Sequence, residues 1–131
     1  LHRKPTYNEF KDEDFPIEVQ AGVTLKTIIG EGSPVNLESR ILMKDIFIEN
    51  QQQFAYTVQH EKTVAMVVIS GTGKILDVHT GEKHSINKQD FALIYAEQRG
   101  ELIIQANTDT PLRVVAIEVP AQVDYPLYRD R

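Results

Sequence analysis

The stretch Thr63-Val64-Ala65-Met66-Val67-Val68-Ile69-Ser70-Gly71 decides the fold. Its apolar part, residues 64–69, is far shorter than the roughly 20 residues that a membrane-spanning helix requires. A short apolar run that ends at a turn signal is typical of a β-strand buried on both faces. We therefore predict a central strand at residues 63–69 that ends at Ser70-Gly71.

Eight further apolar or alternating runs lie around this strand at fairly even spacing, with Gly, Asn, Asp or Pro between them. They cover residues 23–29, 41–49, 53–59, 74–79, 83–86, 91–96, 101–106 and 112–119. The 3.6-residue period of an amphipathic helix is not visible anywhere in the sequence. Nine short strands with almost no helix favour a sandwich, a barrel or a jelly roll. We predict an all-β jelly roll.

The composition describes one small acidic globular domain. The 131 residues are 41% hydrophobic and 25% charged, and 14 Lys and Arg against 19 Asp and Glu give a net charge of −5. This length fits a single core. The basic residues are scattered, so we expect no nucleic-acid partner. With no cysteine, no signal peptide and no membrane-length apolar run, we expect a cytoplasmic protein.

Three regions follow from the distribution of charge and apolar residues. Residues 1–20 are rich in acidic residues and predict an extended linker or N-terminal arm. Residues 21–120 hold all nine predicted strands and form the domain, and residues 121–131 form a C-terminal tail. Because the chain starts at Leu1, we expect it to be a fragment of a longer protein.

The segment Ser70-Gly71-Thr72-Gly73-Lys74 resembles a phosphate-binding loop only superficially. That motif requires glycine at position 68 and Ser or Thr at position 75, whereas the chain has Val68 and Ile75. The segment also connects two strands, so no helix N-terminus would face a phosphate. We interpret it as a tight glycine-rich hairpin. The serines likewise lack the sequence context of a catalytic nucleophile.

His79 and His84 flank a candidate turn at Gly81-Glu82. A two-residue turn there would place the two imidazoles opposite each other, with Cβ atoms about 5 Å apart. However, Leu76 and Val78 are expected to face the core, which turns His79 toward solvent. We predict an exposed hairpin without a metal.

Diffuse motifs at matching intervals connect the chain to a known family. They are the lead-in Pro5-Thr6-Tyr7-Asn8-Glu9-Phe10 with Pro16, the segments Gly22-Val23-Thr24-Leu25-Lys26, Gly30-Glu31 and Ser33-Pro34-Val35, the apolar strands ending at Ser70-Gly71, and Gln89-Asp90-Phe91-Ala92-Leu93-Ile94. With these motifs, residues 5–119 resemble the C-terminal cupin domain of pirin-like proteins, in the RmlC-like cupin superfamily. The resemblance implies a double-stranded β-helix.

Pirin-like proteins are typically bicupins. Their iron lies in the N-terminal domain, held by three His and one Glu; some members show quercetin 2,3-dioxygenase activity, and a eukaryotic member is a nuclear transcriptional co-regulator. The resemblance implies that this chain is the second half alone. Its partner would be the N-terminal cupin domain of the same protein or a homodimer mate, with contacts through Tyr7, Phe10 and Phe15 of the arm. The iron would lie in the other domain.

The cupin metal motif H-x-H-x-x-x-E-x-x-x-x-x-x-G can be aligned on Gly71. Its ligand positions then fall on Val58, His60 and Val64, and the third histidine, from the second motif, falls on Ala92. His60 is thus the one candidate ligand, and an open catalytic metal site needs about three. We predict no metal, no cofactor and no catalytic residue in this chain, and an apolar filling of the barrel.

The main hypothesis is therefore a non-catalytic cupin domain with a structural role. One alternative is a small metal-dependent cupin dioxygenase, similar to quercetinases, that uses His60 with partners brought together by folding. Another is a jelly-roll module that binds small ligands, but such a module would need exposed aromatic residues. With 8% aromatic residues and no tryptophan, the composition gives that alternative little support.

Overall fold

The stretch at residues 63–71 forms strand β5 (Lys62–Ser70), an interior strand of the larger of two antiparallel sheets. This computed structural model describes residues 9–35, 40–96 and 99–120. All nine predicted strands are present, to within two residues at each end. They are β2 (Val23–Ile29), β3 (Leu42–Ile48), β4 (Gln53–Val58), β5, β6 (Thr72–Asp77), β7 (Lys83–Asn87), β8 (Phe91–Ala96), β9 (Gly100–Ala106) and β10 (Leu112–Pro120).

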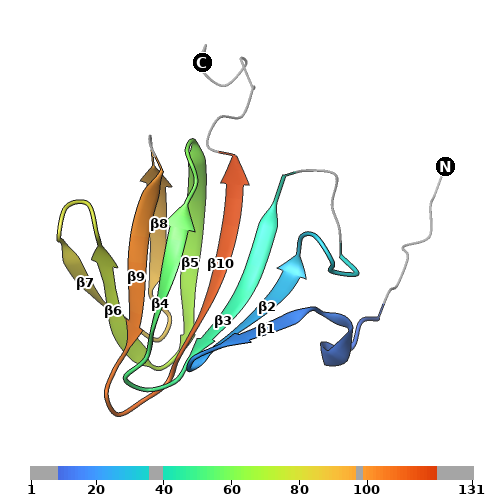
Figure 1. The fold of residues 1–131 in the computed structure, drawn as a ribbon, viewed down its shortest axis with the longest axis horizontal. Coiled ribbons are helices and arrows are strands. Elements are labelled where there is room, and N and C mark those ends of the chain that lie inside the picture. Colours follow the sequence, from blue (N-terminus) through green and yellow to red (C-terminus); the bar gives the residue numbers. More distant parts are fainter. Residues whose placement is uncertain (1–8, 36–39, 97–98, 121–131) are drawn as a thin grey trace.

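The two sheets face each other and enclose one apolar interior (Figure 1). The six-stranded sheet has the order β1-β2-β3-β10-β5-β8, and the four-stranded sheet has the order β4-β9-β6-β7. Strand β10 lies between β3 and β5, and Ala116 is paired with both Lys44 and Met66. From β3 onward the chain crosses to the other sheet at every connection except β6–β7, which is typical of a jelly roll.

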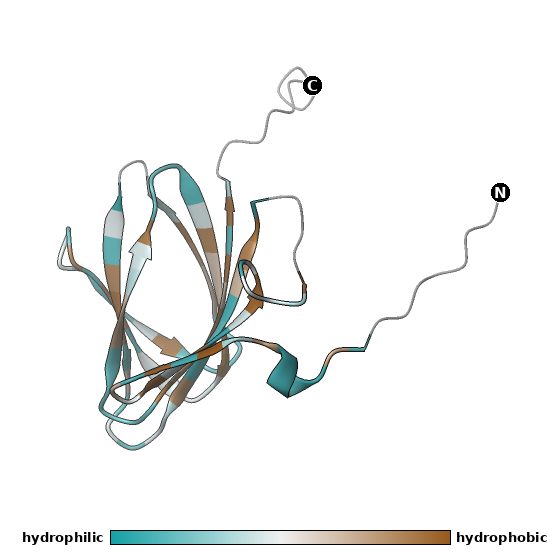
Figure 2. Ribbon diagram, turned by 45° about the vertical axis from the view of Figure 1, so that its right-hand side comes forward, coloured by the Kyte–Doolittle hydropathy of each residue, from teal (hydrophilic) through white to brown (hydrophobic). Residues whose placement is uncertain are grey.

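The core follows the two-residue period of the strands. In β5 the side chains of Val64, Met66 and Val68 are buried, whereas the alternate residues point outward. The fully buried side chains with the largest volumes come from both sheets: Ile46, Ile48, Val58, Val64, Met66, Ile104, Leu112 and Val114. Figure 2 shows the resulting alternation of hydrophobic and hydrophilic segments along the strands.

Gly71 forms a corner and not the predicted hairpin. It is the one residue between β5 and β6, and these strands lie in different sheets. Its φ is 86°, and a Cβ atom there would overlap the carbonyl oxygen of Pro111. A residue with a side chain fits neither this backbone conformation nor this close approach. The glycine therefore allows the chain to cross from one sheet to the other in a single residue.

The structure adds a strand in the region expected to be an extended arm. Strand β1 (Ile17–Gln20) pairs with β2, with Ile17 opposite Lys26, and it follows a 3-10 turn, η1 (Asp12–Asp14). Lys26 also contacts the carboxylate of Asp12. All four residues of β1 are exposed, including Val19 at 73%. This part of the arm is therefore an edge strand of the larger sheet.

Candidate functional site

The end of the barrel beside the β4–β5 turn is the position where the cupin motif would place its metal. Val58, in the last position of β4, and Val64, in β5, are buried at 1% and 0% exposure. Tyr56 points to the same interior from β4 and is 7% exposed. Apolar side chains thus occupy two of the motif's ligand positions.

Glu118 is a candidate functional residue that was not predicted from the sequence. Among the residues that the structure describes, it is the one charged side chain that is buried. It follows Leu112, Val114 and Ala116 in the inward-facing row of β10. It is paired with Val64 of β5, and its Oε1 atom has no hydrogen-bond partner. The strict alternation along β10 could have identified Glu118 as inward-facing.

Glu118 and Tyr56 interact electrostatically across the interior. Burial, and to a smaller extent the negative charge of Glu118, raise the pKa of the Tyr56 hydroxyl above its ordinary value. Both causes favour the neutral hydroxyl. Two oxygen-bearing side chains therefore face an apolar space.

The donor set does not fit the metal of a cupin enzyme. His60 lies in the turn after β4, with its side chain 65% exposed and its Nε2 atom 3.6 Å from Oε1 of Glu61. Ala92 is paired with Met66, whereas Ile94 is the β8 residue beside Val64. Across the described ranges, no group of three His, Cys, Asp or Glu could hold a metal ion. His60 therefore remains separate from the interior.

His79 and His84 are not opposite each other across the hairpin. Asp77 ends β6, and its Oδ1 atom accepts hydrogen bonds from the backbone N–H groups of His79 and Thr80, at 2.9 and 3.3 Å. His79 thus lies in a loop, whereas His84 is paired with Ile75 in the sheet. The predicted two-residue turn is wrong because the Asp77 side chain stabilises a longer loop.

The orientation predicted for β6 is also wrong. Ile75 is the buried residue of this strand at 6% exposure, whereas Val78, which was expected in the core, is 48% exposed. A shift of one position along a strand moves every side chain to the opposite face. Val78 itself lies beyond the end of β6, in the exposed loop at residues 78–82.

Of the three aromatic residues expected to contact a partner, Tyr7 lies outside the described residues. Phe10 and Phe15 pack edge to face, with ring centroids 6.3 Å apart. Phe10 is 43% exposed and Phe15 is half-buried. The two rings thus form a small apolar cluster ahead of β1.

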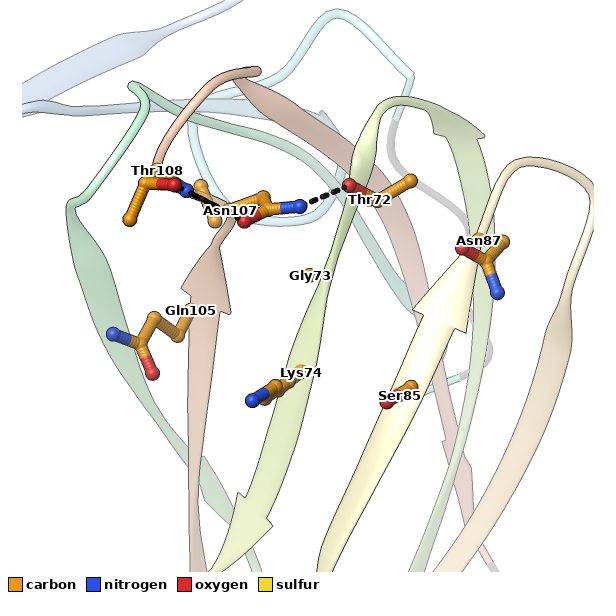
Figure 3. Close-up of a pocket in the computed structure, with 9 residues that line it drawn as sticks. Thr72, Gly73, Lys74, Ser85, Asn87, Gln105, Asn107 and Thr108 are labelled. Carbon is orange, nitrogen blue, oxygen red and sulfur yellow. Dashed lines mark hydrogen bonds between the residues drawn. The ribbon is translucent and has the colours of Figure 1, made fainter.

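A polar groove of about 240 Å³ crosses the outer surface of the four-stranded sheet. Figure 3 shows Gln105 on β9, Lys74 on β6 and Ser85 on β7 along it, with Asn107 donating to Oγ1 of Thr72 at 3.0 Å. Lys74 is the one charged residue that lines it. Exposed polar side chains of this kind are normal for a solvated sheet face.

The outer face of the six-stranded sheet is apolar over β8, β5 and part of β10, and charged beside it at Asp45 and Arg113. Leu93, Ala65, Ile117 and Met43 form one continuous cross-strand row on β8, β5, β10 and β3. We define the outer apolar face as this row together with Phe91, Tyr95, Val67 and Val115. Phe91, Leu93 and Tyr95 are 61%, 68% and 54% exposed. Contiguous apolar patches of this type mark interaction sites.

Similarity to solved structures identifies the fold of this chain. The chain is similar to quercetin 2,3-dioxygenase from Acinetobacter baumannii, with a TM-score of 0.70 and 17% identity over 89% of this chain and 40% of that one. The polyketide cyclase RemF from Streptomyces resistomycificus is similar too, with a TM-score of 0.66 and 10% identity over 92% of this chain and 83% of that one. The chain is also similar to a cupin-2 domain from Rhodospirillum rubrum, with a TM-score of 0.65 and 10% identity over 93% of this chain and 80% of that one.

These similarities confirm the predicted cupin jelly roll. At such low identity they show the fold alone, and function must be argued from the site. No protein-family model matches the sequence, and no curated protein matches it. Within the described residues, no helix is long and apolar enough to cross a membrane.

Proposed function

We propose that this chain is the non-catalytic C-terminal cupin domain of a pirin-like protein. In this proposal its role is structural: it packs onto a second cupin domain through the outer apolar face. The iron implied by the family resemblance would then lie in that other domain. In the chain alone, a second copy would occupy the same face.

The observation that carries the proposal is the row Leu93, Ala65, Ile117 and Met43. An antiparallel sheet with one solvated face normally alternates apolar inward residues with polar outward ones. Here the outward-facing residues 65 and 67 of β5 and 115 and 117 of β10 are apolar although they point away from the core. A protein domain that covers the outer face would remove this apolar surface from water.

The distribution of charge is compatible with a copy of the same chain as the occupant. A net charge of −5 makes two copies repel each other in general. The residues of the outer apolar face carry no charge, and the charged pair beside them is internally compensated. Nη2 of Arg113 lies 2.5 Å from Oδ2 of Asp45, and Nε lies 3.0 Å from Oδ1. Two copies related by a two-fold axis could therefore meet here without opposing like charges.

The arm offers a second candidate contact, at the β1 edge of the larger sheet and therefore at the opposite edge from β8. Tyr7, Phe10 and Phe15 remain our candidates for contacts between domains or subunits, with Phe10 the more exposed of the two described rings. Because β1 already pairs with β2, the arm would present these rings from a fixed edge of the larger sheet.

Light scattering after size-exclusion chromatography tests the proposal. The full chain should elute with about twice the mass of one 14.9 kDa chain. Leu93→Lys should reduce this to the mass of one chain because it places a charge in the interface. Val78→Lys is the matched control, since Val78 is an exposed apolar residue outside the outer apolar face. A parent chain that is monomeric at every accessible concentration would contradict the proposal.

Metal analysis tests the proposal that this domain is non-catalytic. Protein purified without added chelator should contain transition metal well below one equivalent. A stoichiometric metal would instead favour the dioxygenase alternative with His60.

A further inference from the structure

A cleft of about 280 Å³ opens into the interior between β7 and β8. These two strands are edges of different sheets, so no backbone hydrogen bonds join them along this side. Its inner walls are Met66, Val68, Ile75, Ile86 and Val114, and its mouth is formed by His84, Ser85, Asp90, Phe91 and Ala92. We call this feature the seam cleft.

The seam cleft is open to solvent on one side, and the residues of its inner walls are each exposed by 6% or less. Cores are packed about as densely as organic crystals, with few voids larger than a water molecule. The inner walls are all apolar, so a water molecule there would find none of the two to four polar partners that it needs. At the mouth, Ala92 fills little of the space beside Met66, with which it is paired. The cleft therefore suits an apolar occupant better than water.

The size and polarity of the cleft define the occupant. A cavity of about 150 Å³ lined by aliphatic side chains can hold a benzene ring, so about 280 Å³ admits one or two fused rings. The thioether of Met66 makes favourable contacts with an aromatic ring. Polar groups are confined to the mouth.

The polar groups at the mouth select against an anion. Asp90 accepts a hydrogen bond from the backbone N–H of Asn87 at 2.8 Å, which fixes its carboxylate at the turn. The carboxylate of Glu82 lies 3.4 Å from Nε2 of His84, which also lines the mouth. Two carboxylates near the opening would repel an anionic ligand and could accept a hydrogen bond from a neutral one.

We propose that the seam cleft binds a small uncharged molecule with one or two aromatic rings and a hydrogen-bond donor. This site is largely separate from the outer apolar face, because neighbouring residues of β8 point to opposite sides of the sheet, and the two share only Phe91 at the rim. Ala92 faces the cleft, whereas Leu93 belongs to the outer apolar face.

Titration of the full chain with indole, followed by amide shifts in two-dimensional NMR, tests the site. Saturable shifts should concentrate on Met66, Ile86 and Ala92. Indole-3-acetate, which adds a negative charge to the same ring, should bind at least about tenfold more weakly, equivalent to about 1.4 kcal/mol.

Variants on the two sides of β8 complete the test. Ala92→Phe should fill the cleft and weaken indole binding at least about tenfold, whereas Leu93→Lys should leave it unchanged. If the spectrum shows that Ala92→Phe is unfolded, the smaller change Ala92→Leu should weaken binding by at least about fivefold. The site is refuted if shifts concentrate on Leu93 and Tyr95, if none saturates by about 10 mM indole, or if the folded Ala92 variant binds like the parent.

Discussion

Glu118 lies directly opposite Val64 across the β10–β5 ladder, and its carboxylate points into the same apolar interior as the valine side chain. Its Oε1 atom has no hydrogen-bond partner. A buried polar atom without a partner costs free energy of folding because it has lost its hydration. The chain thus carries a locally unfavourable carboxylate beside a position where metal-binding cupins would place a glutamate ligand.

We expect Glu118→Leu to raise the free energy of unfolding by about 1 to 3 kcal/mol, because it removes the unpaired atom. Glu118→Gln should have a smaller effect, since the amide is neutral but still polar. Urea unfolding at neutral pH measures both changes. Glu101→Gln, at an exposed position of β9, is the control and should change stability by less than about 0.5 kcal/mol. A loss of stability in both Glu118 variants would show that the carboxylate is satisfied.

Tyr56 should make stability depend on alkaline pH. Its folded pKa is raised, so the folded state holds the hydroxyl proton more tightly than the unfolded state, whose pKa is about 10. The contribution is fully present below about pH 10 and is lost above it, at up to about 1.4 kcal/mol per pH unit. Chemical unfolding between about pH 9 and 11 should show a smaller decline for Tyr56→Phe than for the parent. An equal decline of stability with pH in the parent and in Tyr56→Phe would contradict this contribution of Tyr56.

Gly71→Ala should be strongly destabilising, by about 3 kcal/mol or more, because the new methyl group overlaps the carbonyl oxygen of Pro111 at a positive φ. Gly81→Ala is the matched control: its φ is 79°, but a Cβ atom there meets nothing within 4 Å. It should cost only about 1 kcal/mol. Thermal and urea unfolding give both values, and equal costs would show that backbone conformation alone decides the effect.

The strands were predictable because each is short, apolar or alternating, and bounded by turn residues. Val64, Met66 and Val68 show why: residues two apart fall on one face, which the core then buries. Strand β1 was missed because Ile17 and Val19 are its only apolar residues and both are exposed among charged neighbours. Its pairing with β2 is a tertiary contact that local composition does not reveal.

Local patterns also failed where one side chain or one residue changes the geometry. Asp77 caps a five-residue loop at residues 78–82, which separates His79 from His84. Gly71 sends β6 into the other sheet, so the expected β5–β6 hairpin does not form. The candidate His60 was identified from the spacing, but its exposed position in a turn depends on where β4 ends. The inward orientation of Glu118 could have been predicted from the sequence, because this residue continues the alternating row of inward-facing residues in β10.

Hydroxyl-radical footprinting of the full chain across a range of protein concentrations tests most directly whether the outer apolar face is a docking surface. Phe91, Leu93 and Tyr95 should become protected as the concentration rises, whereas Val78, which is also exposed, should react equally at every concentration. Unchanged reactivity of the three β8 side chains, in samples whose measured mass shows self-association, would place the interface elsewhere and contradict the account.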